Sequence, residues 1–489
     1  MLLDRYNLKV YQAGIKFILY VAVKKVLNSE VSFSHSLDKG LYTEILINRK
    51  ITESDINNIK LEMDKIISDD LKITKKVIAK NDAYNFYMKN KEFEKAGNIC
   101  NLNNKVVTLY ELAGYHNYFM SNMPSSTGKL KQYKITFLGN NALILSVPIE
   151  DDGNIPDYEP QEKICESFRL YNRWIRTLGI KYVNDLNKII SENKIKDFIM
   201  KNDIMMDNQV YNVAVKIKES KKKIILLGGP SSSGKTTSTK KIALYLETFG
   251  LNPIYLGLDD YFKNRNETPK DENNKYDFES LNAIDLKLFN KHLTMLLNGE
   301  NVSIPSFNFF TGEKEYKNRI IKLKDNDIIL IEGLHCLNEE LTKEISRDIK
   351  LKIYISPFTP IGIDRHNHLS TIDIRLLRRI IRDSWSRGYT SEHTLEAWDK
   401  VREGEVKYVF PYTNEADMIL NTAFIYEVGV LRVYGEPLLY SIPPESKYYN
   451  EARRMIDFMQ MFFPIPSEYI ENDNVLREFI GGSYFEGRY

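Results

Sequence analysis

The stretch GGPSSSGKTT, residues 228–237, carries residue types that can hold phosphate groups. Glycines let backbone N–H groups converge on phosphate oxygens without a Cβ clash, and the start of a following helix adds partial positive charge. The stretch matches the pattern G-x-x-x-x-G-K-[ST], which predicts a nucleoside triphosphate site. In this reading Lys235 reaches the β- and γ-phosphates, and the Thr236 hydroxyl binds Mg²⁺. The predicted triphosphate-binding set is Gly229, Ser231, Ser232, Ser233, Gly234, Lys235, Thr236 and Thr237.

Acidic residues follow two other apolar runs. Asp259 and Asp260 come directly after PIYLGL, and Glu332 ends the run IILIE. A carboxylate at the end of a buried strand can accept a proton from a substrate hydroxyl, orient that hydroxyl, or share the metal shell. We expect Asp259 to act on the hydroxyl because it comes first after the strand; the alternative is an Asp pair that caps a turn. The predicted metal set is Thr236, Asp259 and Glu332.

A third set of charged side chains lies in STIDIRLLRRIIRDSWSRGYT, residues 370–390. On a helix, Arg375, Arg378 or Arg379, and Arg382 fall on one face. The acids nearby in the sequence are Asp373 and Asp383. A planar, always protonated guanidinium can bind two phosphate oxygens, so this face predicts stabilisation of charge during phosphoryl transfer. A solvated charged face is the alternative.

Repeated apolar runs must position these side chains. They occupy residues 223–229, 253–258, 327–333, 351–356 and 416–421, with helix-like segments between several of them. Such runs are typical of strands buried on both faces of a parallel sheet. Alternating strands and helices predict an α/β fold with a doubly wound parallel sheet, whose ligand site lies at the carboxyl ends of the strands.

The N-terminal part reads as a separate α+β region, so we expect domains at 1–200 and 201–489. Residues 51–67 predict a helix with Thr52 or Ser54 as N-cap, and residues 135–148 predict two short strands around a turn. An amphipathic helix is expected near the start of the chain, a loop at 150–160, and a helical stretch from 161 to about 220.

Composition narrows the function classes. The 489 residues carry a formal net charge of +2, which disfavours nucleic acid as a partner. The three cysteines lie far apart and predict neither a disulfide framework nor a metal cluster. The apolar run at 17–23 is too short to cross a membrane. We therefore expect a cytoplasmic protein without a membrane partner; a homo-oligomer remains open.

Between Lys223 and Thr422 the chain resembles the phosphoribulokinase/uridine kinase family of P-loop kinases. The resemblance rests on the order and spacing of GGPSSSGKTT, LDDYFKNR, YDFESLNAIDLKLF, VSIPSFNFFTGEK, IILIEGLHCLN, RLLRRIIRDSWSRGYT and EGEVKYVFPYTNEADMILN. It implies a P-loop NTPase-type fold, ATP and Mg²⁺ as cofactors, and phosphorylation of an alcohol group, typically the 5′-hydroxyl of a nucleoside.

The resemblance also implies roles for individual residues. Asp259 matches the catalytic aspartate of the family, and Glu279 matches the acid that holds the ribose hydroxyls. Arg379 matches a substrate-side arginine, while Arg382 and Arg387 match lid arginines that close over the ATP phosphates. The implied catalytic set is Asp259, Lys235, Arg382 and Arg387, and the implied substrate-binding set is Asp259, Glu279, Phe307, Arg379 and Tyr389.

Two positions depart from the uridine kinase pattern. Phe307 can stack on a base, but Gly312 stands where the family has a histidine, and Tyr389 stands where it has an arginine that contacts the nucleoside. A pocket without those donors cannot discriminate uracil by the same hydrogen bonds. The acceptor therefore remains open between a nucleoside and another hydroxylated metabolite such as a sugar phosphate.

Residues 33–67 resemble the additional domain of threonyl- and alanyl-tRNA synthetases. Lys39 stands where a second histidine would complete an HxxxH metal motif with His35, so we expect a structural role for His35. This resemblance leaves an RNA-binding regulatory ATPase as a further alternative. Residues 474–485, NVLREFIGGSYF, resemble the end of long bacterial kinases that combine both regions, and the sequence assigns them no chemistry.

Overall fold

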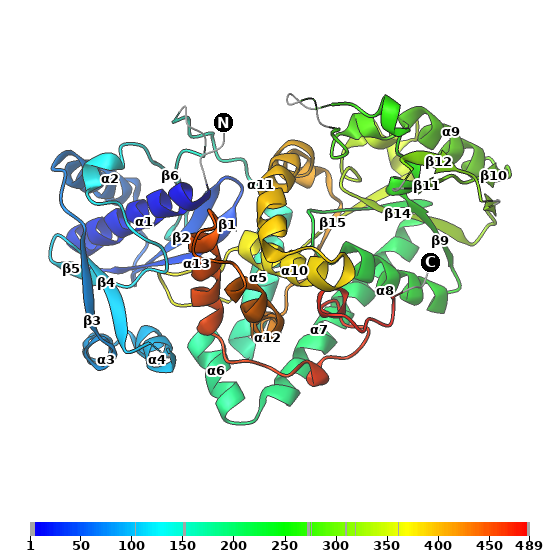
Figure 1. Cartoon of the computed structure of the whole chain (residues 1–489). Helices are drawn as coiled ribbons and strands as arrows, with labels where there is room; N and C mark the ends of the chain where they lie inside the picture. Colours follow the sequence, from blue (N-terminus) through cyan, green and yellow to red (C-terminus); the bar gives the residue numbers. More distant parts are fainter. Residues whose placement is uncertain are drawn as a thin grey trace. The chain divides into compact units, whose positions relative to one another are not determined.

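The computed structural model describes residues 5–102, 104–149, 153–270, 274, 276–308, 311–317, 319–359 and 361–486, which leaves part of the expected 150–160 loop outside the description. The chain forms two compact units, each made of three stretches (Figure 1). The first unit comprises Met1–Ile195, Thr359–Ile374 and Val428–Ile465. The second comprises Lys196–Phe358, Arg375–Glu427 and Pro466–Tyr489. Two late stretches thus join the N-terminal region in one unit.

The first unit contains antiparallel sheets and helices. Its four-stranded sheet has the order β1 (Glu30–Leu37), β2 (Gly40–Leu46), β7 (Ala142–Ser146), β6 (Lys134–Gly139). A three-stranded sheet has the order β3 (Thr74–Ala79), β4 (Val106–Leu112), β5 (Tyr115–Asn117). Its helices include α1 (Arg5–Leu27), α2 (Glu53–Ser68), α3 (Lys80–Lys89), α4 (Phe93–Asn101), α5 (Glu162–Thr177), α6 (Val183–Ser191) and α13 (Tyr449–Gln460).

Several expected elements of this unit are present. Thr52 is the N-cap of α2, and its hydroxyl and the Asp55 carboxylate form a capping box. The two short strands at 134–146 meet at a turn where Asn140 and Asn141 have positive φ. The first helix differs from the amphipathic prediction, because Phe17–Val23 are buried on every side. The cause is that α2 covers one side of α1 while β1 and β4 cover others.

The second unit is built on a five-stranded parallel sheet with the order β16–β15–β8–β14–β9. The strands are β8 (Ile224–Gly228), β9 (Asn252–Gly257), β14 (Asp327–Gly333), β15 (Lys350–Ser356) and β16 (Met418–Asn421). The helices include α7 (Ile195–Ser220), α8 (Lys235–Thr248), α9 (Leu286–Leu297), α10 (Thr371–Ser386), α11 (Ser391–Tyr408), α12 (Glu427–Tyr440) and α14 (Arg477–Ile480). Three of these helices cross the boundary between the units, because α7 and α10 begin in the first unit and α12 ends there. Two short ribbons pair β10 (Val302–Ser303) with β13 (Ile320–Ile321) and β11 (Ser306–Asn308) with β12 (Glu313–Glu315).

The parallel sheet confirms the expected α/β fold and explains the continuous apolar runs. Every residue of β8 and β15 is buried, because neighbouring strands and helices cover both faces. The order of the strands matters for chemistry. β14 lies between β8 and β9, and its Glu332 pairs in register with Leu227 on one side and Gly257 on the other. The loops after these three strands therefore meet at one edge of the sheet.

Among the residues that the structure describes, no helix combines the length and the apolar character needed to cross a bilayer.

Candidate active site

The loop between β8 and α8 has the shape of a phosphate cradle. Ser232 and Gly234 have positive φ values of 57° and 81°. A Cβ at Gly229 would lie 2.2 Å from the Ile355 carbonyl oxygen, and a Cβ at Gly234 would lie 2.5 Å from Cγ1 of Val475. Glycine is therefore required at both positions, for backbone conformation at Gly234 and for close approach at both. A glycine-containing turn of this kind can aim successive backbone N–H groups at one anion.

Lys235, the first residue of α8, folds back over this loop. Its ammonium donates hydrogen bonds to the carbonyl oxygens of Gly229 and Pro230, both at 2.9 Å. Burial lowers the pKa of Lys235, while nearby carboxylates, of which Glu332 has the largest effect, oppose that shift. The cation thus lies at the loop, where it can neutralise a bound phosphate.

Thr236 and Glu332 form the part of the site that suits a cation. The Thr236 hydroxyl donates to Oε1 of Glu332 at 3.0 Å, and the Thr239 hydroxyl lies 3.4 Å from Oε2. Burial raises the pKa of Glu332 to about 7, and the charges of Glu478 and Asp259 add to that shift, while Lys235 and the Thr236 hydrogen bond oppose it. Hydroxyl and carboxylate oxygens are the donors that Mg²⁺ prefers, so these two residues fit a magnesium ion that also binds substrate phosphates.

Asp259 and Asp260 lie in the short helix that follows β9 and face different partners. The Asp259 side chain is reached by solvent, yet surrounding protein atoms and the charge of Asp260 raise its pKa, while Lys235 and Arg387 oppose the shift. Asp260 accepts from the backbone of Phe307 and lies 3.7 Å from a guanidinium nitrogen of Arg319. The structure therefore brings Asp259, and not Asp260, into the electrostatic field of the phosphate loop.

The arginines of α10 divide into two groups. Arg375 and Arg378 are buried, and each pairs with a buried carboxylate, Glu405 or Glu427. The expectation that Asp373 and Asp383 would be their neighbouring acids is wrong for these two residues. Asp373 instead pairs with Lys9 and Arg454 in the first unit. A buried guanidinium needs a counterion, and distant acids supply it here.

The second group gathers around Asp383, which is buried. Its carboxylate lies 3.2 Å from Arg379, 2.9 Å from Arg382 and 3.4 Å from Arg387. Arg379 also donates to the Ser231 hydroxyl of the phosphate loop at 2.8 Å. One carboxylate cannot neutralise three guanidinium groups, so this end of α10 keeps net positive charge beside the loop.

Sequence reasoning missed Glu405 and Glu478, which contact the loop directly. Oε1 of Glu405 accepts the Ser231 N–H at 2.9 Å, and Oε2 of Glu478 accepts the Thr237 N–H at 3.1 Å. Neither acid carries a local motif, because each acts through a contact that is distant in the sequence. Glu405 could have been suspected only from its place in the quoted stretch EGEVKYVF.

The predicted acceptor residues lie in different surroundings. Burial raises the pKa of Glu279, and Arg379 opposes that shift, so these two charges lie close to each other. Phe307 is buried and packs edge-to-face on Phe262, with ring centroids 5.6 Å apart. Tyr389 is exposed and its ring lies 4.6 Å from that of His393. Glu279 and Arg379 therefore lie at the loop, while Phe307 belongs to an aromatic cluster.

His35 of the first unit has structural partners. Its ring stacks on Tyr42 and Phe168 with centroids 5.0 and 3.6 Å away, and burial lowers its pKa to about 3. Within the described residues, no group of three His, Cys, Asp or Glu side chains is arranged to hold a metal ion by itself.

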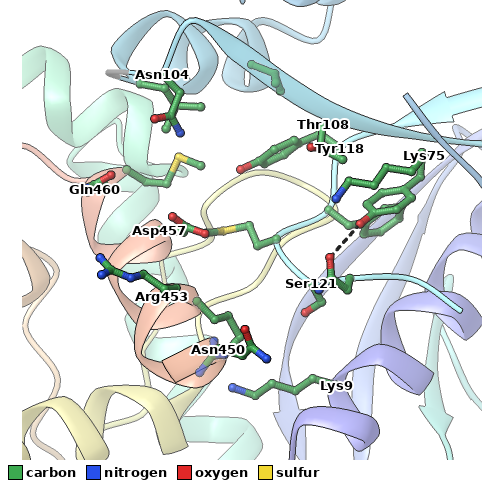
Figure 2. A pocket seen from close by; sticks show the side chains of 18 of the residues that line it. Lys9, Lys75, Asn104, Thr108, Tyr118, Ser121, Asn450, Arg453, Asp457 and Gln460 are labelled. Atoms are coloured by element: carbon green, nitrogen blue, oxygen red, sulfur yellow. Dashed lines mark hydrogen bonds between the residues drawn. The ribbon is translucent and has the colours of Figure 1, made fainter. Parts of the chain in front are cut away.

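A cavity of about 330 Å³ lies within the first unit. In Figure 2, α13 supplies Arg453, Asp457 and Gln460 to the lining on one side of the cavity, and Lys75 and Tyr118 lie on the other side. The side chains known to line it include none of the site residues predicted from the sequence.

Together, the parallel sheet and the loop with its lysine, acids and arginines define a P-loop kinase. The model of the "Phosphoribulokinase / Uridine kinase family" matches residues 224–425. The uridine kinase of Borrelia duttonii is 31% identical over 204 residues, which are 40% of this chain and 85% of that protein. The uridine kinase of Anoxybacillus flavithermus is 29% identical over 203 residues, which are 41% of this chain and 87% of that protein. The chain therefore belongs to the phosphoribulokinase/uridine kinase family.

A solved structure, described as a possible uridine kinase from Bacillus stearothermophilus, shares 16% identity with this chain. It covers 44% of this chain and 98% of its own, and its TM-score of 0.27 is too low to add to the family assignment.

Proposed function

We propose that this kinase transfers the γ-phosphoryl group of ATP to a hydroxyl group of a nucleoside, the 5′-hydroxyl. The observation that carries the proposal is that Glu332 lies at the end of β14, while Asp259 and Lys235 lie in the segments that follow the neighbouring parallel strands β9 and β8. Lys235 and the loop amides bind the triphosphate, and Thr236 and Glu332 would hold Mg²⁺. Mg²⁺, when bound, supplies neutralisation of phosphate charge.

Asp259 acts on the acceptor. Its carboxylate takes the proton of the acceptor hydroxyl as the oxygen bonds to the γ-phosphorus, and the bond between that phosphorus and the β-γ bridging oxygen breaks. The protein atoms around the solvent-reached Asp259 side chain, and next the charge of Asp260, raise its pKa, which makes the carboxylate a stronger base than an unperturbed aspartate. We assign to Glu279 the hydrogen bonds from the hydroxyls of a ribose, and the nearby charge of Arg379 supports its place at this site.

Arg382 and Arg387 stabilise charge on the transferring group. Both share Asp383 with Arg379, and the charge of Arg387 acts on Asp259. A guanidinium beside the γ-phosphate is worth several powers of ten in rate in related chemistry. When these side chains close over the site they also exclude water, so the acceptor and not water takes the phosphoryl group.

A second candidate acceptor is a metabolite that already carries an anionic group, such as a sugar phosphate. The specific observation is at Gly312, where an added Cβ would lie 2.8 Å from Nε of Arg265. Arg265 therefore occupies the space beside the position at which the family resemblance places a histidine. A guanidinium there suits a phosphate group better than a uracil ring.

The test is direct identification of a product. The full chain is incubated with MgATP and separate pools of nucleosides and sugar phosphates, and masses that increase by one phosphoryl group are sought. A phosphorylated nucleoside supports the first proposal, and a phosphorylated sugar phosphate supports the second. Consumption of ATP without any phosphorylated acceptor would contradict both.

A further inference from the structure

The C-terminal segment, residues 466–486, packs on the phosphate loop although it lies outside residues 224–425 that match the family. Its Val475 covers Gly234, and its Phe485 carbonyl accepts a hydrogen bond from Lys240 of α8 at 3.0 Å. In Figure 1 this segment, drawn in red, runs beside α8. An element beyond the kinase core thus forms part of the surface around the nucleotide site.

Glu478 makes the contact with chemical consequence. Its Oε2 accepts hydrogen bonds from the backbone N–H of Thr237 at 3.1 Å and from the Thr237 hydroxyl at 2.8 Å. Thr237 is the third residue of α8, where free N–H groups and the helix dipole favour an anion. Both donors of Thr237 therefore already hold a carboxylate, in the part of the loop that was predicted to bind phosphate.

The negative charge of Glu478 reaches the rest of the site. It acts on Lys235 and Lys240 and adds to the shift of the Glu332 pKa. A carboxylate and a phosphate cannot both accept from Thr237, and two anions held this close in a partly buried site repel each other. Binding of a triphosphate that uses Thr237 must therefore displace Glu478.

The surroundings allow a local displacement. Asp473 pairs with Lys241 at 2.9 Å, and Asn474 donates to Asp203 at 3.0 Å, so the chain just before α14 is anchored to α7 and α8. After Glu478, the Phe479 carbonyl accepts a hydrogen bond from the Trp385 indole at 2.6 Å. Because these contacts hold the chain on both sides of Glu478, the Glu478 carboxylate can move without release of the whole C-terminal segment.

We infer that Glu478 is an affinity-determining residue of the nucleotide site, because its carboxylate competes with a phosphate group of the nucleotide for both donors of Thr237. The inference rests on the proposed function in taking ATP as the nucleotide. It makes the C-terminal segment an internal competitor that lowers affinity for nucleotide and sets the concentration at which the site fills.

The experiment compares MgATP binding by calorimetry in the full chain and in Glu478→Gln, which keeps the shape and removes the charge. The dissociation constant is expected to fall by about tenfold, since a competing charge-assisted hydrogen bond is lost. Glu471→Gln is the matched control, because Glu471 is an exposed acid of the same segment, and its affinity should equal that of the wild type. In steady-state assays the KM for ATP should fall in Glu478→Gln with little change in kcat.

A second variant covers the case in which Glu478→Gln fails to fold. Glu478→Ala removes both the charge and the hydrogen-bond acceptor, so it should bind MgATP more tightly than the wild type. Equal or weaker binding in the folded variants, with normal binding by the wild type, overturns the inference and leaves the proposed function standing. Failure of every protein, wild type included, to bind MgATP overturns the proposed function as well.

Discussion

Glu405 ties the phosphate loop to two arginines, and its replacement by glutamine gives the sharpest prediction about stability. Both Glu405 and Arg375 are 1% exposed. Glu405 forms two hydrogen bonds with Arg375, one with Arg402 at 2.7 Å and one with the Ser231 N–H at 2.9 Å. Glu405→Gln keeps the shape but leaves the Arg375 guanidinium without its counterion.

Removal of one partner of a buried ion pair costs ~3–5 kcal/mol. Glutamine can still accept one hydrogen bond, so we expect about 3 kcal/mol at neutral pH. Burial alone would raise the pKa of Glu405, but Arg375 and Arg402 hold it below its ordinary value. The contribution is therefore complete above pH ~4.3, the usual pKa of a glutamate, and is lost as the pH falls through the lowered folded value.

The assay is urea unfolding followed by tryptophan fluorescence, because the Trp398 ring lies 5.5 Å from the Arg375 guanidinium and reports on this contact. Glu403→Gln on the same helix is the control, since Glu403 is exposed, and its effect should stay within ~0.5 kcal/mol. A loss below about 1 kcal/mol for Glu405→Gln at pH 7 would refute the reasoning, as would a difference from wild type that grows below pH 4.

Three further predictions concern the same unit. Burial raises the pKa of Asp203 to about 7, so the native state binds more protons than the unfolded state, and the free energy of unfolding should fall as the pH rises from ~4 to ~7. In urea titrations at several pH values, Asp203→Asn should flatten that slope. An unchanged slope would contradict the assignment of the pH dependence to Asp203. Gly234→Ala should weaken MgATP binding at least about tenfold in calorimetry, because Gly234 has a φ of 81° and a Cβ there would lie 2.5 Å from Val475. Wild-type affinity in this variant would argue against the phosphate-binding conformation of the loop. Glu332→Gln should raise the Mg²⁺ concentration for half-maximal activity by about tenfold, and no change would remove Glu332 from the metal site.

Local sequence pattern was sufficient for the core of the second unit. Strands such as β8 and β15 are buried on both faces, so their side chains form continuous apolar runs that identify them. Gly234 marks a backbone conformation that other residues rarely adopt, and at both Gly229 and Gly234 a neighbouring atom leaves no room for a Cβ. The acids at the ends of β9 and β14 could be predicted because parallel strands end at the same edge of a sheet. The strand order then places these acids beside the phosphate loop.

Long-range contacts account for what sequence pattern did not predict. The acid that neutralises Arg375 lies 30 residues away, and the acid at Thr237 lies 241 residues away. Asp373 joins Lys9 across 364 residues and thereby ties a late stretch to the first unit. Such pairings depend on tertiary packing, which has no local signature in the chain. The predicted roles of Asp259 and the lid arginines remain predictions.

The most direct test of the account is a single-turnover measurement of γ-phosphoryl transfer by Asp259→Asn, with Asp260→Asn as the matched control. Asp259 lies in the field of Lys235 and Arg387, whereas Asp260 faces Arg319. We predict that Asp259→Asn binds MgATP within about threefold of the wild type and transfers the phosphoryl group ~10²–10⁴-fold more slowly, while Asp260→Asn loses less than tenfold. Wild-type transfer by Asp259→Asn would contradict the assignment of this carboxylate to the acceptor hydroxyl.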